Sequence, residues 1–110
     1  SLYLAIESLK GKIYKENIQK VILERDFLRT KLKEIGISML PSFSNTLMSL
    51  DSYPISFYEG LDKKGVSVVL VPDPDNNTHF RIAIQKPPIN QLFFNKVKEQ
   101  YYETFISNKF

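Results

Sequence analysis

The sequence predicts an α+β fold: two layers, with a small, mostly antiparallel sheet and helices on one face. Apolar residues recur at helical spacing in the first and last thirds of the chain. Between them lie short β-branched or alternating runs bounded by prolines and turn formers. The resulting order is two helices, two strands, a helix, two strands and a helix. Helices covering one side of a sheet are the usual solution for such an order.

The first third of the chain is expected to form two helices. Apolar residues within 2–9 recur at i, i+3, i+4 and i+7, and Gly11 is expected to end that segment. A longer helix is expected over residues 17–35, followed by Gly36, which suits the left-handed residue after a helix C-terminus. Its predicted inner face consists of Ile18, Val21, Ile22, Leu28, Leu32 and Ile35, with Phe27 at the edge and Arg29 among the outer residues.

The middle of the chain is expected to form strands around one short helix. Residues 37–40 and 45–50 are extended segments, and a helix begins near Pro54, which suits a first turn. The predicted inner face of that helix is Ile55, Tyr58 and Leu61. Two further strands, 66–71 and 79–84, are joined by PDPDNN, a connection longer than the tightest hairpin turn.

The last element is a helix over residues 88–105, after two prolines that end the sheet. Its apolar residues recur at helical spacing, so one face is expected to pack on the core. That predicted inner face is Ile89, Leu92, Phe93, Val97 and Tyr101.

An arginine stands in the middle of the last predicted strand. Because side chains alternate along a strand, Phe80, Ile82 and Ile84 would face the helices, whereas Arg81 would face away from them. An unpaired charge in a buried strand costs several kcal/mol, so Arg81 is expected to reach water or a partner. From the spacing alone, an ion pair with a nearby acid is favoured over a ligand site. The planar fork of donors also suits a carboxylate or phosphate.

Composition excludes several classes of protein. With 43% apolar and 25% charged residues, the 110 residues indicate one ordinary globular domain spanning 1–110. No cysteine is present, which excludes disulfides, thiolate metal sites and cysteine nucleophiles. The net charge of +3 is scattered, so nucleic-acid binding is a minor alternative. No apolar run reaches the roughly 20 residues of a membrane helix, and no signal peptide is recognisable, so a cytoplasmic protein is expected.

No complete catalytic or metal-binding set is visible. Residues 73–77 imitate the D-x-D-x-N opening of a calcium loop, but Thr78 and Ile84 stand where glycine and glutamate are required. A turn is the better interpretation. His79 is the one histidine and lacks further ligands, so a surface histidine at a strand end is expected.

Five motifs follow one another between residues 24 and 97, within a resemblance that covers about residues 13 to 105: ERDFLRTKLKEIGI, PSFSN, KKGVSVV, HFRIAI and PPINQLFFNKV. Their order and spacing resemble the C-terminal small domain of fold-type-I pyridoxal-phosphate-dependent aminotransferases of class I/II. The histidinol-phosphate aminotransferase-like enzymes are the most similar subgroup. The matching residues are Glu24, Arg25, Leu28, Gly36, Pro41, Ser42, Asn45, Gly65, Arg81, Ile82, Ala83 and Ile84.

This resemblance implies a function and two site residues. In that family the arginine matching Arg81 binds the α-carboxylate of the amino-acid substrate, and the asparagine matching Asn45 borders the cleft. The groups that hold pyridoxal phosphate (PLP) lie in a large N-terminal domain that these residues do not include. The resemblance therefore implies the C-terminal domain fragment of a homodimeric enzyme that transfers an amino group between an amino acid and a 2-oxo acid. PLP is expected in the parent enzyme, but not bound to this fragment, which is expected to be inactive alone.

One departure from the family pattern leaves the substrate open. The histidinol-phosphate subgroup has a second arginine in a G-x-x-x-R-like segment, and here that position, counted from Gly65, is Val69. A different amino acid or 2-oxo acid is therefore an equal alternative. A second class of function also stays open, a free-standing, non-catalytic protein-interaction module that uses the helix-free face of the sheet.

Overall fold

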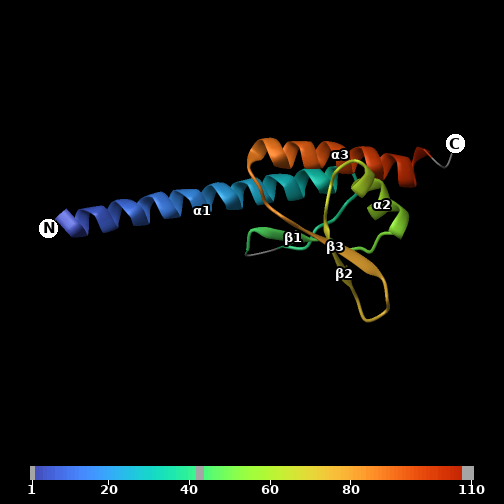
Figure 1. The fold of residues 1–110 in the computed structure, drawn as a ribbon, viewed down its shortest axis with the longest axis horizontal. Helices are drawn as coiled ribbons and strands as arrows, with labels where there is room; N and C mark the ends of the chain where they lie inside the picture. The colour runs from blue at the N-terminus through green and yellow to red at the C-terminus, as the bar shows by residue number, and fades with distance from the viewer. Residues whose placement is uncertain (1, 42–43, 108–110) are drawn as a thin grey trace.

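The computed structural model describes residues 2–41 and 44–107, which form two layers (Figure 1). The elements in chain order are α1 (Leu2–Glu34), β1 (Thr46–Met48), α2 (Ile55–Lys63), β2 (Val69–Pro72), β3 (Thr78–Ala83) and α3 (Pro87–Phe105). The helices lie on one side of the sheet, and α1 runs beside α3. This arrangement confirms the predicted α+β class. No helix in the described ranges is both long and apolar enough to cross a membrane.

The sheet is antiparallel, with strand order β1-β3-β2, so the last strand is the central one. Leu47 pairs with Ile82, and Val69 pairs with Arg81. Phe80 and Ile82 are buried under the helices, while Arg81 is exposed. The alternation predicted for this strand is therefore confirmed, and Arg81 lies on the face that points away from the helices.

The core lies between the sheet and the helices. An aromatic group joins α2 to the central strand, with the ring of Phe57 5.6 Å from that of Tyr58 and 6.3 Å from that of Phe80. These centroid distances are within the range that aromatic pairs favour. The full set of buried apolar residues is Leu28, Leu32, Ile37, Met39, Leu47, Phe57, Tyr58, Leu61, Phe80, Ile82, Ile84, Phe94 and Val97.

Helix α1 is one continuous helix of 33 residues, so the prediction of two helices separated at Gly11 is wrong. A glycine in a helix interior costs only about 1 kcal/mol relative to alanine, too little to end a helix flanked by good helix formers. The N-terminal half of α1 extends beyond the sheet (Figure 1). Ile18, Val21 and Ile22, which were predicted to face the core, are therefore between 37% and 41% exposed.

The C-terminal end of α1 confirms the role predicted for Gly36. Its φ is +105°, its N–H donates to Lys33 O at 3.1 Å, and the N–H of Ile37 donates to Leu32 O at 2.9 Å. These two hydrogen bonds are the Schellman pattern, in which a left-handed residue satisfies the last carbonyls of a helix. The chain is thereby turned from α1 toward the sheet.

The predicted strand over residues 37–40 is wrong, because this segment forms only a single bridge between Met39 and Ser49. Pro41 has no N–H to continue a ladder. Around that bridge, Leu40 N–H donates to Met48 O at 2.8 Å and Leu50 N–H donates to Ser38 O at 2.9 Å. Helix α1 also holds the segment, with Arg29 Nε donating to Met39 O at 3.0 Å. Arg29 was predicted to be solvated, but its guanidinium satisfies a loop carbonyl.

Two helices also bury residues other than those predicted. On α2, Phe57 is buried and Ile55 is 61% exposed. On α3, Phe94 is buried, whereas Ile89 and Leu92 are 51% and 58% exposed. The first turns of α3 border an open hollow rather than the core, so their apolar side chains have no layer to pack against.

Candidate functional site

Arg81 lies at the centre of the sheet with apolar neighbours on both sides. Met48 of β1 and Val69 of β2 are its cross-strand partners. Among the described residues, the guanidinium makes no ion pair and no side-chain hydrogen bond. The ion pair favoured from the spacing is therefore absent from this part of the chain. The fork of donors is left to water or to an anionic ligand.

A hollow of about 400 Å³ opens beside Arg81. The start of β2, the end of β3 and the first turns of α3 line it. Three of its apolar residues are more than half exposed, namely Val69 at 51%, Ile89 at 51% and Leu92 at 58%. Arg81 is the one charged residue among those that line the hollow. Leu28, Ile82 and Phe93 line the hollow from the helix side, and Arg81, whose side chain points away from the helices, stands at its edge, where an anion could reach the guanidinium.

Asn90 fixes the corner at which β3 passes into α3. Its Oδ1 accepts the N–H of Gln85 at 3.0 Å, and its Nδ2 donates to Gln85 O at 2.8 Å and to Glu24 Oε1 at 3.1 Å. Asn90 is only 3% exposed. A buried amide whose donors and acceptor are satisfied specifies one arrangement of the groups around it. The corner therefore joins α1, β3 and α3, and sets where the α3 wall lies relative to Arg81.

Asn45 lies apart from this hollow. It is exposed in the bend before β1, and its carbonyl accepts the N–H of Ile84 at 2.7 Å. It precedes Met48, the partner of Arg81, by three residues, or roughly 10 Å along the strand. The described structure does not bring Asn45 and Arg81 into one hollow, and a substrate-binding role for Asn45 stays a prediction. Ser42, another residue of the family pattern, lies outside the described residues.

His79 belongs to a separate cluster on β3. Its Nε2 is 2.9 Å from Asp73 Oδ2, and its Nδ1 is 3.2 Å from the carbonyl oxygen of Ser49. Both partners are acceptors, so the ring carries two protons when it donates to both. The hydrogen bond with Asp73 raises the pKa of His79, and the same bond lowers the pKa of Asp73. The predicted surface histidine therefore ties the β2–β3 connection to the residue after β1.

The acidic connection between β2 and β3 is a turn, as predicted. Asp73 Oδ1 accepts the N–H of Asp75 at 2.9 Å and that of Asn77 at 3.0 Å, and Asn76 has φ +63°. An aspartate that bonds the backbone two residues on is a standard turn-forming contact. Within the described ranges, no group of three or more histidine, aspartate or glutamate side chains could hold a metal ion.

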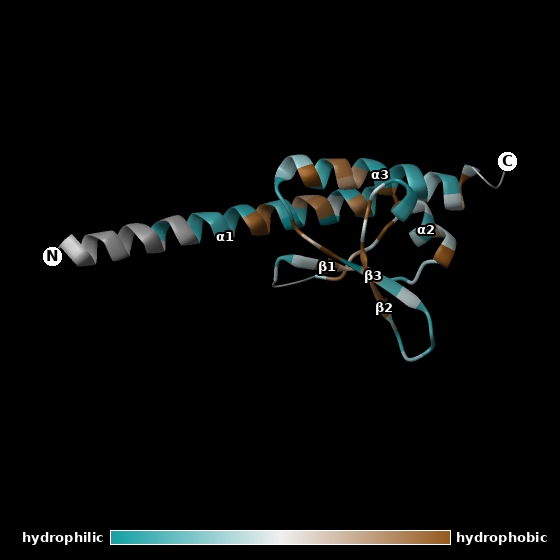
Figure 2. Ribbon diagram, in the orientation of Figure 1, coloured by the Kyte–Doolittle hydropathy of each residue, from teal (hydrophilic) through white to brown (hydrophobic). Residues whose placement is uncertain are grey.

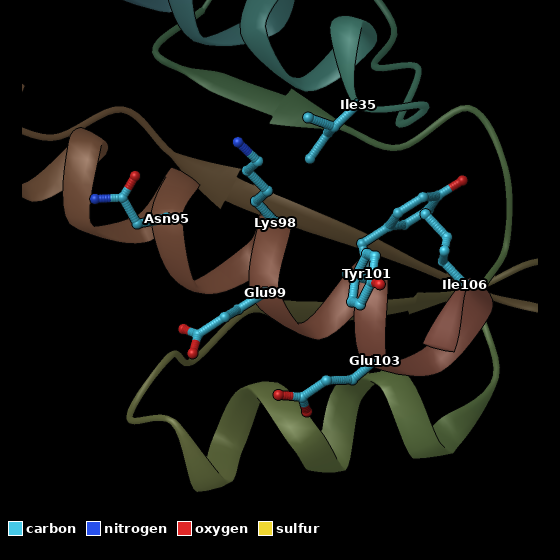
Figure 3. A pocket seen from close by; sticks show the side chains of 8 residues that line it. Ile35, Asn95, Lys98, Glu99, Tyr101, Glu103 and Ile106 are labelled. Atoms are coloured by element: carbon cyan, nitrogen blue, oxygen red, sulfur yellow. The ribbon is translucent and has the colours of Figure 1, made fainter. Parts of the chain in front are cut away.

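A second hollow, of about 480 Å³, lies at the C-terminal end of α3 (Figure 3). Ile35, just past the end of α1, borders it together with Tyr101 and Ile106 of the α3 end. One cation, Lys98, and two anions, Glu99 and Glu103, line it, so its charges do not favour an anionic ligand. It also lacks the unpaired fixed donor that Arg81 provides, and we take the Arg81 hollow as the candidate site.

The residues around Arg81 were mostly missed by sequence reasoning. Ile89 and Leu92 have the spacing of a core-facing helix stripe, and that spacing is the same whether the stripe meets a core or a ligand. The sequence feature that could have indicated this site is the pair Pro87 and Pro88, because two prolines at the start of a helix fix the direction in which its first turn leaves the sheet.

Comparisons with known proteins agree with the order of the motifs. A histidinol-phosphate aminotransferase of Brachyspira hyodysenteriae is 30% identical over 101 residues, which covers 89% of this chain and 28% of that protein. A candidate aminotransferase from Burkholderia pseudomallei has a solved structure with a TM-score of 0.69 at 18% identity, covering 82% of this chain and 28% of that one. No family model matches the chain.

The chain thus spans little more than a quarter of the length of either relative. It resembles aminotransferases in sequence and in fold, which confirms the resemblance predicted from the motifs.

Proposed function

We propose that this chain is the C-terminal part of a PLP-dependent aminotransferase in which Arg81 binds the substrate carboxylate. The observation that carries the proposal is an exposed arginine with no ion-pair partner in the described ranges, at the edge of a hollow, in a chain similar to aminotransferases. A guanidinium can make two parallel hydrogen bonds to one carboxylate. The amino acid and the 2-oxo acid of a transamination both carry that carboxylate, so one arginine serves both halves of the reaction.

The contribution of Arg81 in this proposal is to position the substrate. Strands on both sides of β3 hold its backbone, so the start of the side chain is fixed. A carboxylate bound through two hydrogen bonds loses its freedom to rotate, and the reacting carbon is held in one orientation. Binding and orientation, rather than proton transfer, are therefore the tasks assigned to this chain.

The residues around the hollow do not fit PLP itself. Its phosphate group needs several donors, and its aldehyde needs a lysine, whereas the lining residues include no lysine and one cation. We assign the cofactor to a domain outside these 110 residues, and expect the chain alone to bind no PLP and to show no turnover. A new absorbance band of protein-bound PLP, on adding the cofactor to the purified chain, would contradict this assignment.

The proposal is tested by replacing Arg81 in the full-length protein that carries this chain. Arg81→Met should lower kcat/KM about 30-fold or more, since losing one partner of a desolvated charge pair costs about 2–5 kcal/mol and 1.4 kcal/mol is tenfold. The kcat/KM of Arg81→Lys should lie between those of Arg81→Met and the unsubstituted protein, because lysine keeps the charge but cannot make two parallel hydrogen bonds to one carboxylate. Lys63→Met, which removes an exposed cation on α2, is the matched control and should leave kcat/KM unchanged. Unchanged kcat/KM in Arg81→Met would remove Arg81 from the substrate site.

A second candidate function is a non-catalytic interaction module. The observation that favours it is a stretch of apolar residues in the middle of α1 (Figure 2), of which Leu23 is 70% and Phe27 54% exposed. Exposed apolar patches of this kind mark protein contacts. A homodimer of the proposed enzyme would also cover such a surface, so partner binding alone does not discriminate. Turnover of any amino donor by the full-length protein does, since a module without chemistry has none.

A further inference from the structure

We infer that His79 is a positioning residue for Arg81, because its ring, by donating from both nitrogens, holds the strands on either side of the arginine. The inference rests on the proposed function, since it takes Arg81 as the group that binds the substrate carboxylate. It concerns how substrate affinity changes with pH, and it assigns no chemical step to His79.

The first observation is the place of His79 in the sheet. It lies two residues before Arg81 on β3, so both side chains are on the helix-free face. Its Nδ1 is 3.2 Å from the carbonyl oxygen of Ser49, which directly follows β1, and its Nε2 is 2.9 Å from Oδ2 of Asp73, which directly follows β2. The ring therefore connects all three strands at the end of the sheet beside Arg81.

The second observation is an irregular end of the β1–β3 ladder. Ser49 N–H donates to Phe80 O at 2.9 Å, but Phe80 N–H donates to Ser49 Oγ at 3.0 Å instead of to the Ser49 carbonyl. The carbonyl left out of the ladder is the one that faces His79. Ser49 is 0% exposed, so the loss of the His79 donor would be unfavourable.

Regular pairing offers that carbonyl an alternative donor, the N–H of Phe80. A change to regular pairing would displace the residue before Ser49, which is Met48, the cross-strand partner of Arg81. The contact between His79 and Ser49 therefore decides which of two pairings holds the strand beside the arginine.

The third observation is that both partners of the ring are acceptors. A neutral imidazole has one N–H, so one of the two acceptors then faces a lone pair. The hydrogen bond with Asp73 raises the pKa of His79, and the negative charge of Asp51, in the segment after β1, adds to this. The other groups beside the ring are Arg81 on its own strand and Val71, its uncharged partner on β2. Both contacts are therefore present below the raised pKa, and one is lost as the pH rises through it.

The deciding variant is Asp73→Asn. The asparagine amide can donate to Nε2 of a neutral ring, whose Nδ1–H then donates to Ser49 O, so both contacts are kept without a charge on His79. The asparagine oxygen can still accept the turn N–H groups that Asp73 Oδ1 accepts. If His79 acted only through a stabilising ion pair, this variant would lose the effect rather than make it independent of pH.

The experiment measures KM and kcat for an amino donor in the full-length protein, at pH 6.5 and well above the NMR midpoint of His79. Variants are compared as ratios, because titrations that they share, such as that of the donor's amino group, cancel. The KM of the unsubstituted protein relative to Asp73→Asn should rise about threefold or more between the two pH values, which is the effect of one net hydrogen bond. The ratio of their kcat values should stay constant, since His79 positions Arg81 and takes no part in the reaction.

Two further variants bracket this result. His79→Gln does not titrate in this range, so its KM relative to Asp73→Asn should be the same at both pH values. Asp75→Asn removes a carboxylate of the same turn to which the ring makes no hydrogen bond, and its KM should change with pH as that of the unsubstituted protein does.

Each outcome decides the matter. A KM ratio of unsubstituted protein to Asp73→Asn that does not change with pH overturns the inference, as does a kcat ratio that changes with it. If Asp75→Asn behaves as Asp73→Asn does, the charge of the turn is responsible and the role of His79 is overturned. These results leave the proposed function intact, whereas absence of turnover in the unsubstituted protein overturns both. If His79→Gln fails to fold, as judged by circular dichroism, the comparison of Asp73→Asn with Asp75→Asn still decides.

Discussion

At the scale of single residues, the fold shifts the protonation of His79 in the range near neutral pH. Its two ring nitrogens face Asp73 and Ser49 O, and the hydrogen bond with Asp73 raises its pKa above the ordinary 6.5. The stabilising contribution of His79 is therefore fully present below pH 6.5 and is lost as the pH rises through the raised folded value. The pKa of Asp73 is lowered, so its contribution to stability is present above pH 3.8 and is lost as the pH falls through the pKa of the folded state.

We expect the free energy of unfolding to decrease as the pH is raised above 6.5, and His79→Gln to remove most of this dependence, because an amide does not titrate there. Urea unfolding at pH values on both sides of 6.5 measures this pH dependence, and an NMR titration of the His79 ring gives its pKa directly. Asp75→Asn is the control, since it removes a carboxylate of the same turn that His79 does not contact. An NMR midpoint at or below 6.5 would contradict the two-acceptor arrangement.

Gly36 and Gly65 form a matched pair for a test of backbone strain. Both have positive φ, +105° and +82°, but an added Cβ at Gly36 would lie 2.8 Å from the Tyr101 hydroxyl oxygen, whereas at Gly65 nothing lies within 4 Å. Positive φ in a residue with a side chain costs about 1–3 kcal/mol. We expect Gly36→Ala to lower the free energy of unfolding by about 1 kcal/mol more than Gly65→Ala, because it adds a steric contact. Equal losses in urea titrations would show that Tyr101 moves aside.

At the scale of elements, the corner between β3 and α3 depends on one amide. Asn90→Ala removes the partners of the Gln85 N–H and C=O and of the Glu24 carboxylate. Unsatisfied buried groups cost about 1–3 kcal/mol, so we expect the free energy of unfolding to fall by about 2 kcal/mol. Asn95→Ala, at an exposed position of the same helix, should change the free energy of unfolding little. Urea unfolding of both variants measures the difference. A loss no larger than that of Asn95→Ala would mean that water replaces the Asn90 contacts.

The sequence predicted the elements whose pattern is decided locally. The alternation of β3 was correct because one face of this strand is buried and the other is open. The division of α1 at Gly11 was wrong because one glycine weakens a helix without ending it. The strand at 37–40 was wrong because its pairing with the β1 segment stops after one bridge, and the carbonyl of Met39 accepts from Arg29 of α1 rather than from a further strand.

The candidate site was predictable only in its arginine. The direction of Arg81 follows from strand alternation, which needs no tertiary information. The hollow beside it is assembled from β2, β3 and α3, and the apolar spacing of Ile89 and Leu92 does not say which surface they face. Residues that look like core and remain exposed are where local patterns fail, and a site for a ligand is a common reason for such failure.

At the scale of the whole molecule, the chain measures 68 × 31 × 23 Å because α1 extends well beyond the two layers. Apolar side chains in the middle of α1 are largely exposed, Leu23 at 70% and Phe27 at 54%, so we expect the 110-residue chain to self-associate through them. Leu23→Lys should shift the chain toward monomer in sedimentation velocity. Ile55→Lys, at a comparably exposed apolar position on α2, should not. A monomeric unsubstituted chain at high concentration would contradict this expectation.

The length of α1 has a mechanical consequence. The stretch of α1 from Leu2 to Glu24, which contacts Asn90, is roughly 33 Å long, so a tilt of about 10° about that contact displaces the first turn by about 6 Å. The C-terminal half of α1 is held by two hydrogen bonds: Glu24 accepts from Asn90, and Arg29 donates to Met39 O. A partner that tilts α1 would therefore act first on the Asn90 corner, where Asn90 links Glu24 to Gln85 at the end of the segment that carries Arg81.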